Sequence, residues 1–201
     1  MEKPAPVDYP VHPLIRRRWS PSAFSDKPVD PEILRSLFEA VRWAPSSFNE
    51  QPWFFIVATR DDSVAFERLL ACLTPGNQKW AKRAPVLILS AAKMNFEHNG
   101  KPNRHAFHDV GLAVENLVLQ ATSMDLFVHQ MAGFDREKAR ETYQIPEGFE
   151  PVAAIAVGYG GEPEDLPEDL RGRELAERKR RLTDSFVFSG RWGVTSPIVK
   201  T

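Results

Sequence analysis

The sequence predicts an α+β protein of three layers, in which helices flank a central mixed or antiparallel sheet of four or five strands. Amphipathic helical stretches alternate along the chain with short apolar stretches at 53–59, 86–91 and 151–159. These stretches are hydrophobic at successive positions, which is typical of strands buried on both faces. No Asn-Gly-type turn directly links two of them, so we expect helical connections rather than tight hairpins.

Length and composition limit the classes of protein to which this chain can belong. We expect 201 residues to form one domain, 1–201, with an N-terminal arm at 1–11 and a C-terminal extension at 162–201. The net charge of −1 and the pI near 6.5 give no basic field for nucleic acid or membrane binding. The single cysteine, Cys72, excludes an internal disulfide. No signal-like or membrane-spanning run is visible, so we expect a cytoplasmic protein.

The first third of the chain contains two helices and a strand. Residues 11–18 predict a short helix with Leu14 and Ile15 facing inward. Asp30 and Pro31 form a helix start, because Asp caps the N-terminus and Pro suits the first helical position. This helix should end near residue 43, before a proline. Residues 53–59 then predict a strand at the centre of the sheet, because both of its faces are apolar.

The remaining elements follow the same alternation. We expect Cys72 to pack inside a helix that begins after residue 62. The later segments are predicted to be a short helix at 77–84, a strand at 86–91, a surface loop or lid at 93–104, a long buried helix at 108–124, a strand at 126–131, a helix at 135–143, a strand at 151–159, a linker at 162–168, a charged helix at 170–181 and an apolar end at 183–193 that must dock on something.

A polar loop joins the second helix to the first strand. Four side chains, Ser46, Ser47, Asn49 and Gln51, form a hydrogen-bonding ledge beside apolar walls. We call residues 45–51 the ledge. Ligand pockets combine apolar walls with a few placed polar groups, so the ledge is a candidate binding site. An ordinary loop is the competing interpretation, because these residue types are common in turns.

Two further clusters carry possible chemistry. Arg16, Arg17 and Arg18 precede a serine and could clamp a phosphate, although a solvated charged face is the alternative. The order His105-x-x-His108-Asp109 has no third ligand at a recognisable spacing, so we predict no metal site. The chain has neither a G-x-G-x-x-G motif nor a P-loop, so a Rossmann dinucleotide site is not indicated.

Taken together, R-R-R-W-S-P-S-A-F at 16–24 and P-S-S-F-N-E-Q-P-W at 45–53 resemble the nitroreductase family of FMN enzymes. The pattern D-x-G-x-A-x-x-N-L at 109–117 is similar to that family's long central helix, and the resemblance covers nearly the whole chain. It implies the nitroreductase fold and a homodimer with the flavin at the subunit interface. It also implies a C-terminal arm that wraps the partner subunit.

The resemblance further implies an FMN-dependent NAD(P)H oxidoreductase with ping-pong kinetics. Hydride would pass from NAD(P)H through flavin N5 to a small oxidised acceptor such as a nitroaromatic, quinone or enone, without a catalytic protein residue. The implied cofactor-binding residues are Arg16, Arg17, Arg18, Ser20, Pro45, Ser46, Ser47, Asn49, Gln51, Asn77, Met131, Ala132, Gly133, Arg178, Arg180 and Arg181. The last three are alternatives for one basic residue that reaches the phosphate.

The chain departs from the family at two positions that usually carry a cation near the flavin. These positions hold Ser22 and Trp80. A nearby cation stabilises an anionic reduced flavin, so we expect a lower flavin potential here. The departures keep open a flavin-binding, flavin-destroying or otherwise specialised protein without NAD(P)H-driven turnover. A protein that keeps only the fold and binds no flavin is a further alternative.

Overall fold

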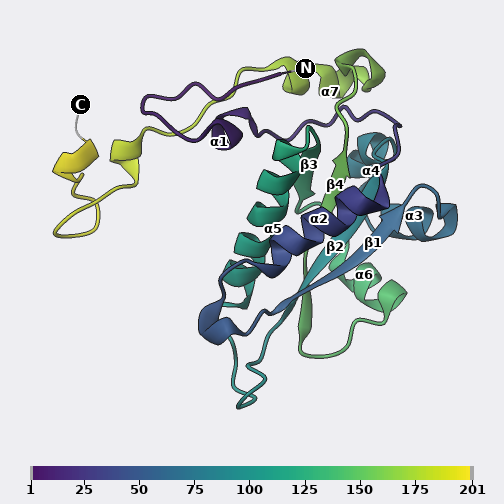
Figure 1. Cartoon of the computed structure of the whole chain (residues 1–201), viewed down its shortest axis with the longest axis horizontal. Coiled ribbons are helices and arrows are strands. Elements are labelled where there is room, and N and C mark those ends of the chain that lie inside the picture. Colours follow the sequence, from purple (N-terminus) through teal and green to yellow (C-terminus); the bar gives the residue numbers. More distant parts are fainter. Residues whose placement is uncertain (1, 200–201) are drawn as a thin grey trace.

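A computed structural model describes residues 2–199 as three layers with two projecting arms (Figure 1). The strands are β1 (Trp53–Thr59), β2 (Val86–Lys93), β3 (Phe127–Met131) and β4 (Phe149–Gly158). The α-helices are α1 (Pro13–Arg17), α2 (Pro31–Arg42), α3 (Ser63–Leu70), α4 (Pro75–Ala81), α5 (Ala106–Ser123), α6 (Arg136–Tyr143) and α7 (Glu168–Leu175). Short 3₁₀ turns are η1 (Ser47–Asn49), η2 (Pro163–Asp165), η3 (Thr183–Ser185) and η4 (Pro197–Val199).

The sheet has the strand order β1-β2-β4-β3, and every pairing is antiparallel. The predicted three-layer α+β fold is therefore confirmed, with four strands. β2 and β4 occupy the centre, and β2 is buried along almost its whole length, as its apolar run predicts. Alternate residues of β2 face opposite layers of the fold. Leu87 and Leu89 pack towards α3, α4 and α6. Val86 and Ile88 pack towards α2 and α5.

The sequence predicts that β1 lies at the centre of the sheet. This prediction is wrong, because β1 is an edge strand. Phe54 keeps 47% of its surface exposed, and Val57 is also exposed. An apolar run on both faces shows that a strand is to be covered, but it does not show that its own chain provides the cover. Aromatic and β-branched residues of this edge strand therefore leave apolar surface exposed.

Three helix predictions need correction. α7 ends at Leu175 rather than at residue 181, since Ala176 is already extended with ψ at 144°. The basic residues that follow offer no apolar face that could hold a further turn against the body. α3 ends at Leu70, so Cys72 is buried in the turn after the helix. In α1, Ile15 is exposed rather than facing inward, because the helix is short and has no buried residue.

The two ends of the chain behave differently. The N-terminal arm runs beside the segment that follows α7 (Figure 1), where Ala5 N–H donates to the Arg16 carbonyl at 2.8 Å. Residues 182–199, the C-terminal arm, project away from the body (Figure 1) and are closed by their own hydrogen bonds, such as Ser196 N–H to the Val187 carbonyl at 2.9 Å. Trp192 in this arm is 92% exposed. Among the described residues, no helix is long and apolar enough to span a bilayer.

Candidate functional site

A cavity of about 600 Å³ lies between α4, residues 18–22, β3, α7 and the segment after α7. We call it the basic cavity, because six basic side chains and only three acidic ones line it. The basic residues are Lys3, Arg18, Arg173, Arg178, Lys179 and Arg180. Its size falls within the roughly 300–1,000 Å³ of small-molecule sites, and its charge suits an anionic ligand.

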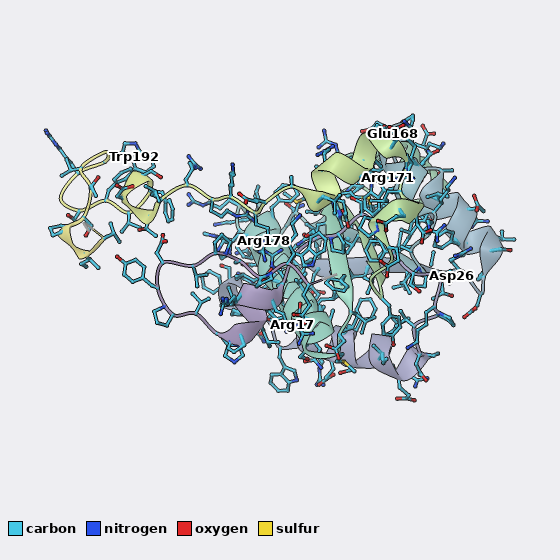
Figure 2. The ribbon with its side chains drawn as sticks, turned by 90° about the horizontal axis from the view of Figure 1, so that it is seen from above. Arg17, Asp26, Glu168, Arg171, Arg178 and Trp192 are labelled. Carbon is cyan, nitrogen blue, oxygen red and sulfur yellow. The ribbon has the colours of Figure 1, made fainter. Side chains whose placement is uncertain are left out.

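Arg178 is fixed at the wall of this cavity. Its Nη1 donates to the Lys3 carbonyl at 2.8 Å and to the Arg16 carbonyl at 3.2 Å, so the two ends of the chain are joined here (Figure 2). Partial burial lowers the pKa of Arg178, and repulsion from the guanidinium groups of Arg18 and Arg180 lowers it further. Three like charges held together are stabilised by an anion placed among them.

The structure separates the residues that were predicted to bind a phosphate. Arg18 and Ser20 line the basic cavity, as do Arg178 and Arg180. Arg17 instead pairs with Asp125 and lines a smaller cavity elsewhere.

Arg16 contributes its carbonyl to Arg178 rather than its side chain to the basic cavity. Arg181 lies outside the lining as well. Of the three C-terminal alternatives, Arg178 and Arg180 are therefore the candidates that the geometry favours.

Aromatic rings and an amide form a further part of the lining of the basic cavity, which we call its ring-lined end. Trp80 is buried and stacks on Phe24, with ring centroids 6.1 Å apart. Its Nε1 donates to Asn77 Oδ1 at 3.3 Å, and Asn77 Nδ2 donates to the Gly133 carbonyl at 2.9 Å. Trp80 and Asn77 both line the cavity together with His129. Flat rings and one amide make this end suitable for a planar heterocycle.

The loop after β3 approaches Asn77 closely. A Cβ atom on Gly133 would come within 2.6 Å of Asn77 Nδ2 and 3.0 Å of Thr74 Oγ1, so any other residue here would displace the Asn77 amide. Met131 is buried in the core, and Ala132 is exposed. Neither of these two predicted residues lines the basic cavity.

A carboxylate that the sequence did not single out organises the cavity wall. Glu174 of α7 is buried, and it accepts hydrogen bonds from Ser22 N–H at 2.9 Å and Ala23 N–H at 3.2 Å. It thus fixes the backbone beside Ser20. In the sequence Glu174 is one of several glutamates in a charged stretch, and no local signal distinguishes it from its solvated neighbours.

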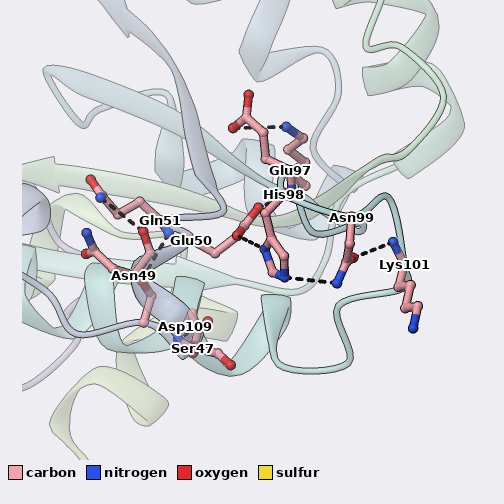
Figure 3. A network of polar contacts seen from close by, with 11 residues as sticks. Ser47, Asn49, Glu50, Gln51, Glu97, His98, Asn99, Lys101 and Asp109 are labelled. Carbon is pink, nitrogen blue, oxygen red and sulfur yellow. Dashed lines mark hydrogen bonds and ion pairs between the residues drawn. The ribbon is translucent and has the colours of Figure 1, made fainter.

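The ledge has an unusual backbone. Phe48, Asn49 and Gln51 adopt positive φ angles of 54°, 56° and 49°. Non-glycine residues in this region cost energy and persist where the surroundings hold them. Ser46 Oγ accepts from Gln51 N–H at 3.0 Å, and Gln51 Nε2 donates to the Asn49 carbonyl at 3.2 Å (Figure 3).

Asp109 at the start of α5 anchors the ledge. Its buried carboxylate accepts from Ser47 N–H at 3.0 Å (Figure 3). His108 Nδ1 lies 3.2 Å from its other oxygen. Within residues 2–199, no group of three or more His, Cys, Asp or Glu side chains is arranged to hold a metal ion. The geometry thus gives Asp109 a role in shaping the ledge, which the sequence had left open.

The loop at 93–104 holds the ledge from the other side. Glu50 accepts from Glu97 N–H and lies 3.4 Å from His98 Nδ1 (Figure 3). The hydrogen bond from Glu97 N–H, followed by the interaction with His98, lowers the pKa of Glu50. Phe48 meets Phe96 edge to face, with centroids 5.8 Å apart.

The two groups of predicted residues do not meet within one chain. Asn49 and Gln51 line an open hollow beside the loop at 93–104, and no ledge residue lines the basic cavity among the described residues. Phe48, at the tip of the ledge, is 82% exposed. The folded chain therefore holds the two groups of predicted residues in separate places.

A family model described as the nitroreductase family matches residues 15–74 and 67–159, which is more than half of the chain. The chain belongs to the nitroreductase family. The match includes the ledge, α5 and the central strands, but it ends before α7 and the C-terminal arm.

Curated relatives support the assignment. An uncharacterized 15.4 kDa protein from the ask 5′ region of Mycolicibacterium smegmatis is 34% identical over 128 residues, covering 64% of this chain and 84% of the relative. A protein of Ralstonia nicotianae with the provisional name NADH dehydrogenase/NAD(P)H nitroreductase is 28% identical over 165 residues, covering 73% of this chain and 83% of the relative.

Solved structures extend the comparison to the arms. A crystal structure described as an oxidoreductase containing FMN has a TM-score of 0.87 and 35% identity, and the match covers 94% of this chain and 96% of that one. A nitroreductase family protein of Clostridium difficile has a TM-score of 0.69 at 22% identity, covering 89% of this chain and 96% of the other. The second likeness shows the fold alone.

Proposed function

We propose that this protein is an FMN-dependent oxidoreductase that takes electrons from NAD(P)H and passes them to a small oxidised acceptor. The observation that carries the proposal is the basic cavity, whose lining combines a cluster of arginines with aromatic rings and an amide. FMN has the same two parts, a phosphate dianion and a planar heterocycle. A cavity of about 600 Å³ can hold a ligand of this size, so the residues present fit the group.

The chain's own residues would bind and orient the cofactor. The guanidinium groups of Arg18, Arg178 and Arg180 would neutralise the phosphate, and the hydroxyl of Ser20 would add a neutral donor. Asn77 would meet the ring edge at the opposite end. FMN, when bound, would supply the redox chemistry by accepting two electrons from NAD(P)H and giving them to the acceptor. Glu174 would keep the wall beside Ser20 rigid through its two backbone hydrogen bonds.

The ledge of a second copy would complete the site, which makes the proposed working form a homodimer. The ledge and the basic cavity of one chain lie apart, while Phe48, Trp43 and Phe54 expose large apolar surfaces. The C-terminal arm likewise exposes Trp192 and Ile198. Apolar surface of this kind marks an interface, and an arm that projects from one body can wrap another. Nothing in the charge balance favours nucleic acid or membrane as a partner.

We also propose a chemical class of acceptor and a cellular location. We expect a nitroaromatic, quinone or enone as acceptor, because an open hollow beside the ledge, lined by Phe48 and His98, suits planar molecules. We also expect the protein to act in the cytoplasm, where NAD(P)H is available and the free thiol of Cys72 stays reduced.

A second candidate function is flavin binding without NAD(P)H-driven turnover. The observation that favours it is the absence of a side-chain cation at Ser22 and Trp80, both of which line the basic cavity. Without those charges an anionic reduced flavin is less stable, so NAD(P)H would reduce the flavin less completely.

An absorbance spectrum of the purified protein tests both candidates. The proposed activity predicts flavin bands after purification or after FMN is added, and it predicts that anaerobic NADH or NADPH bleaches them. Bands that persist with both nucleotides would favour the second candidate. A protein that stays colourless after FMN reconstitution would overturn both.

The dimer has a separate test. Light scattering during size-exclusion chromatography should give twice the chain mass of 22.8 kDa, and Trp192→Ser should weaken the dimer by about tenfold or more, because a buried tryptophan is a typical hot spot. Tyr9→Ser, in the N-terminal arm, is the matched control. A monomer that binds FMN at full affinity would contradict the shared site.

A further inference from the structure

His129 lies at the ring-lined end of the basic cavity and was not singled out by the sequence. It is on the edge strand β3, and its ring packs against that of Trp80 with centroids 4.5 Å apart and planes tilted by 32°. Trp80 itself is buried between His129 and Phe24. His129 therefore covers the indole and presents its own ring to the cavity.

A hydrogen bond sets the tautomer of His129. Its Nδ1 lies 2.7 Å from the carbonyl oxygen of Pro21. A carbonyl oxygen can only accept, so Nδ1 carries the proton. Burial lowers the pKa of His129, and the hydrogen bond to Pro21 opposes this only in part. The lowered pKa favours the neutral ring, in which Nε2 is a hydrogen-bond acceptor.

The surroundings hold this ring in place. Glu174 fixes the backbone that carries the Pro21 carbonyl, through Ser22 N–H and Ala23 N–H. Trp80 is fixed by its hydrogen bond to Asn77. Among the described residues, Nε2 of His129 has no hydrogen-bond partner. It is also absent from the buried polar atoms that lack a partner, so it is accessible to solvent. Nε2 is therefore open to the cavity as a placed, neutral acceptor.

We propose that His129 Nε2 accepts a hydrogen bond from the imide N3–H of the bound flavin ring, which is the only ring N–H of the oxidised heterocycle. This inference rests on the proposed FMN site. If the phosphate lies among Arg18, Arg178 and Arg180, the ring would occupy the part of the cavity that Asn77, Trp80 and His129 line.

The chemistry of the ring supports this pairing. Oxidised isoalloxazine offers acceptors at both carbonyls and at its bare nitrogens, whereas N3–H is its one donor. A cationic or donor-only side chain at this end would pair with any of the acceptors. A neutral acceptor fits only N3–H, so His129 acts as a specificity-determining residue rather than as a source of positive charge.

A comparison of FMN with FMN methylated on N3 tests the proposal, because the methyl group removes the donor. Dissociation constants for the full-length protein come from the quenching of flavin fluorescence, which needs no turnover. Wild-type protein should bind N3-methyl-FMN about tenfold more weakly than FMN, the loss expected when a buried hydrogen bond is removed. In His129→Leu, which has no acceptor, the two flavins should bind within about twofold of each other.

Two further variants sharpen the test. His129→Gln retains an acceptor and should restore part of the preference for FMN. His105→Leu, at an exposed histidine outside the basic cavity, should keep the wild-type ratio. The comparison of the two flavins on wild-type protein does not depend on the folding of any variant.

The outcomes separate the inference from the proposed function. Equal binding of the two flavins by wild-type protein, or an unchanged tenfold preference in folded His129→Leu, would overturn the role of His129 and leave the FMN site standing. Wild-type protein that binds neither flavin would overturn the proposed function and this inference with it.

Discussion

The basic cavity and the ledge are two binding surfaces made in opposite ways. The basic cavity is a hollow whose charged groups come from both ends of the chain, with Arg18 near one end and Arg178 near the other. The ledge is a single seven-residue loop that exposes its groups to open space. One depends on long-range assembly, and the other depends on local backbone shape.

The difference shows what each surface lacks. The basic cavity concentrates like charges around Arg178, so an anion bound there would be stabilised. The ledge holds Phe48, Asn49 and Gln51 in a left-handed backbone that costs energy, while Asp109 and Glu50 hold it in place. Strain kept in an exposed loop is typical of a surface that is shaped for a ligand or partner. We expect the two surfaces to act together across a dimer.

The largest effect on FMN affinity should come from variants that remove the binding groups of one surface and leave the other surface intact. A cavity variant, Arg18→Gln/Ser20→Ala, and a ledge variant, Ser47→Ala/Asn49→Gly, should each bind FMN at least about 30-fold more weakly. Glycine at position 49 tolerates the positive φ of the ledge. A hybrid dimer of the two variants, isolated with two different tags, should regain about one full-affinity site per dimer, because one cavity again faces an intact ledge. If the hybrid dimer regains no site, the surfaces do not combine across subunits.

A smaller effect should distinguish neighbouring arginines. Arg18→Gln should weaken FMN binding by about tenfold, as expected for the loss of a charged hydrogen bond to phosphate. Arg17→Gln is a matched control, since Arg17 is paired with Asp125 outside the basic cavity, and it should change the affinity by less than about twofold. Riboflavin, which has no phosphate, should bind both variants equally in the same titration. Equal losses of FMN affinity in both variants would remove the distinction between the arginines.

The ring end of the basic cavity predicts an effect on the flavin potential. Ser22→Arg would add a cation beside the proposed ring, where Ser22 now contributes only its backbone N–H to Glu174. The flavin midpoint potential should rise by roughly 30 mV, which corresponds to ~1.4 kcal/mol for a two-electron couple. Lys82→Arg, which lies outside the cavity lining, serves as the control. A redox titration without a rise in Ser22→Arg would contradict the electrostatic argument.

The smallest effect concerns the pH dependence of the ledge. The pKa of Glu50 is lowered from its ordinary value of 4.5, mainly by the hydrogen bond from Glu97 N–H. A depressed carboxyl pKa contributes stability above pH 4.5, and this contribution is lost as the pH falls through the lower folded-state pKa. The amide proton shift of Glu97, followed by NMR, should therefore titrate with a midpoint below pH 4.5.

A variant isolates the group responsible for that titration. Glu50→Gln removes the carboxylate, so the Glu97 amide shift should no longer change in this pH range. A titration that persists in Glu50→Gln would assign the effect to another group, such as the neighbouring carboxylate of Glu97.

The sequence predicted much of the fold because local patterns report it directly. The helix start at Asp30-Pro31 and the buried run of β2 lie where residue types and periodicity placed them. The errors occur where a pattern depends on distant partners. β1 was predicted to be central and is an edge strand, since an apolar run does not identify what covers it. α7 was predicted to continue to residue 181 and ends at Leu175, since charge alone does not hold a helix.

The candidate site divides in the same way. The sequence by itself determined the family resemblance, the ledge and the motif of Arg18 and Ser20, because these are short motifs within contiguous stretches of the chain. Only the tertiary structure excluded Arg16 and Arg17 from the basic cavity, identified Asp109 and Glu174 as supports, and brought His129 into the lining of the cavity. The physical reason is separation along the chain: Pro21 and His129 are 108 residues apart, and their hydrogen bond exists only because folding brings them together.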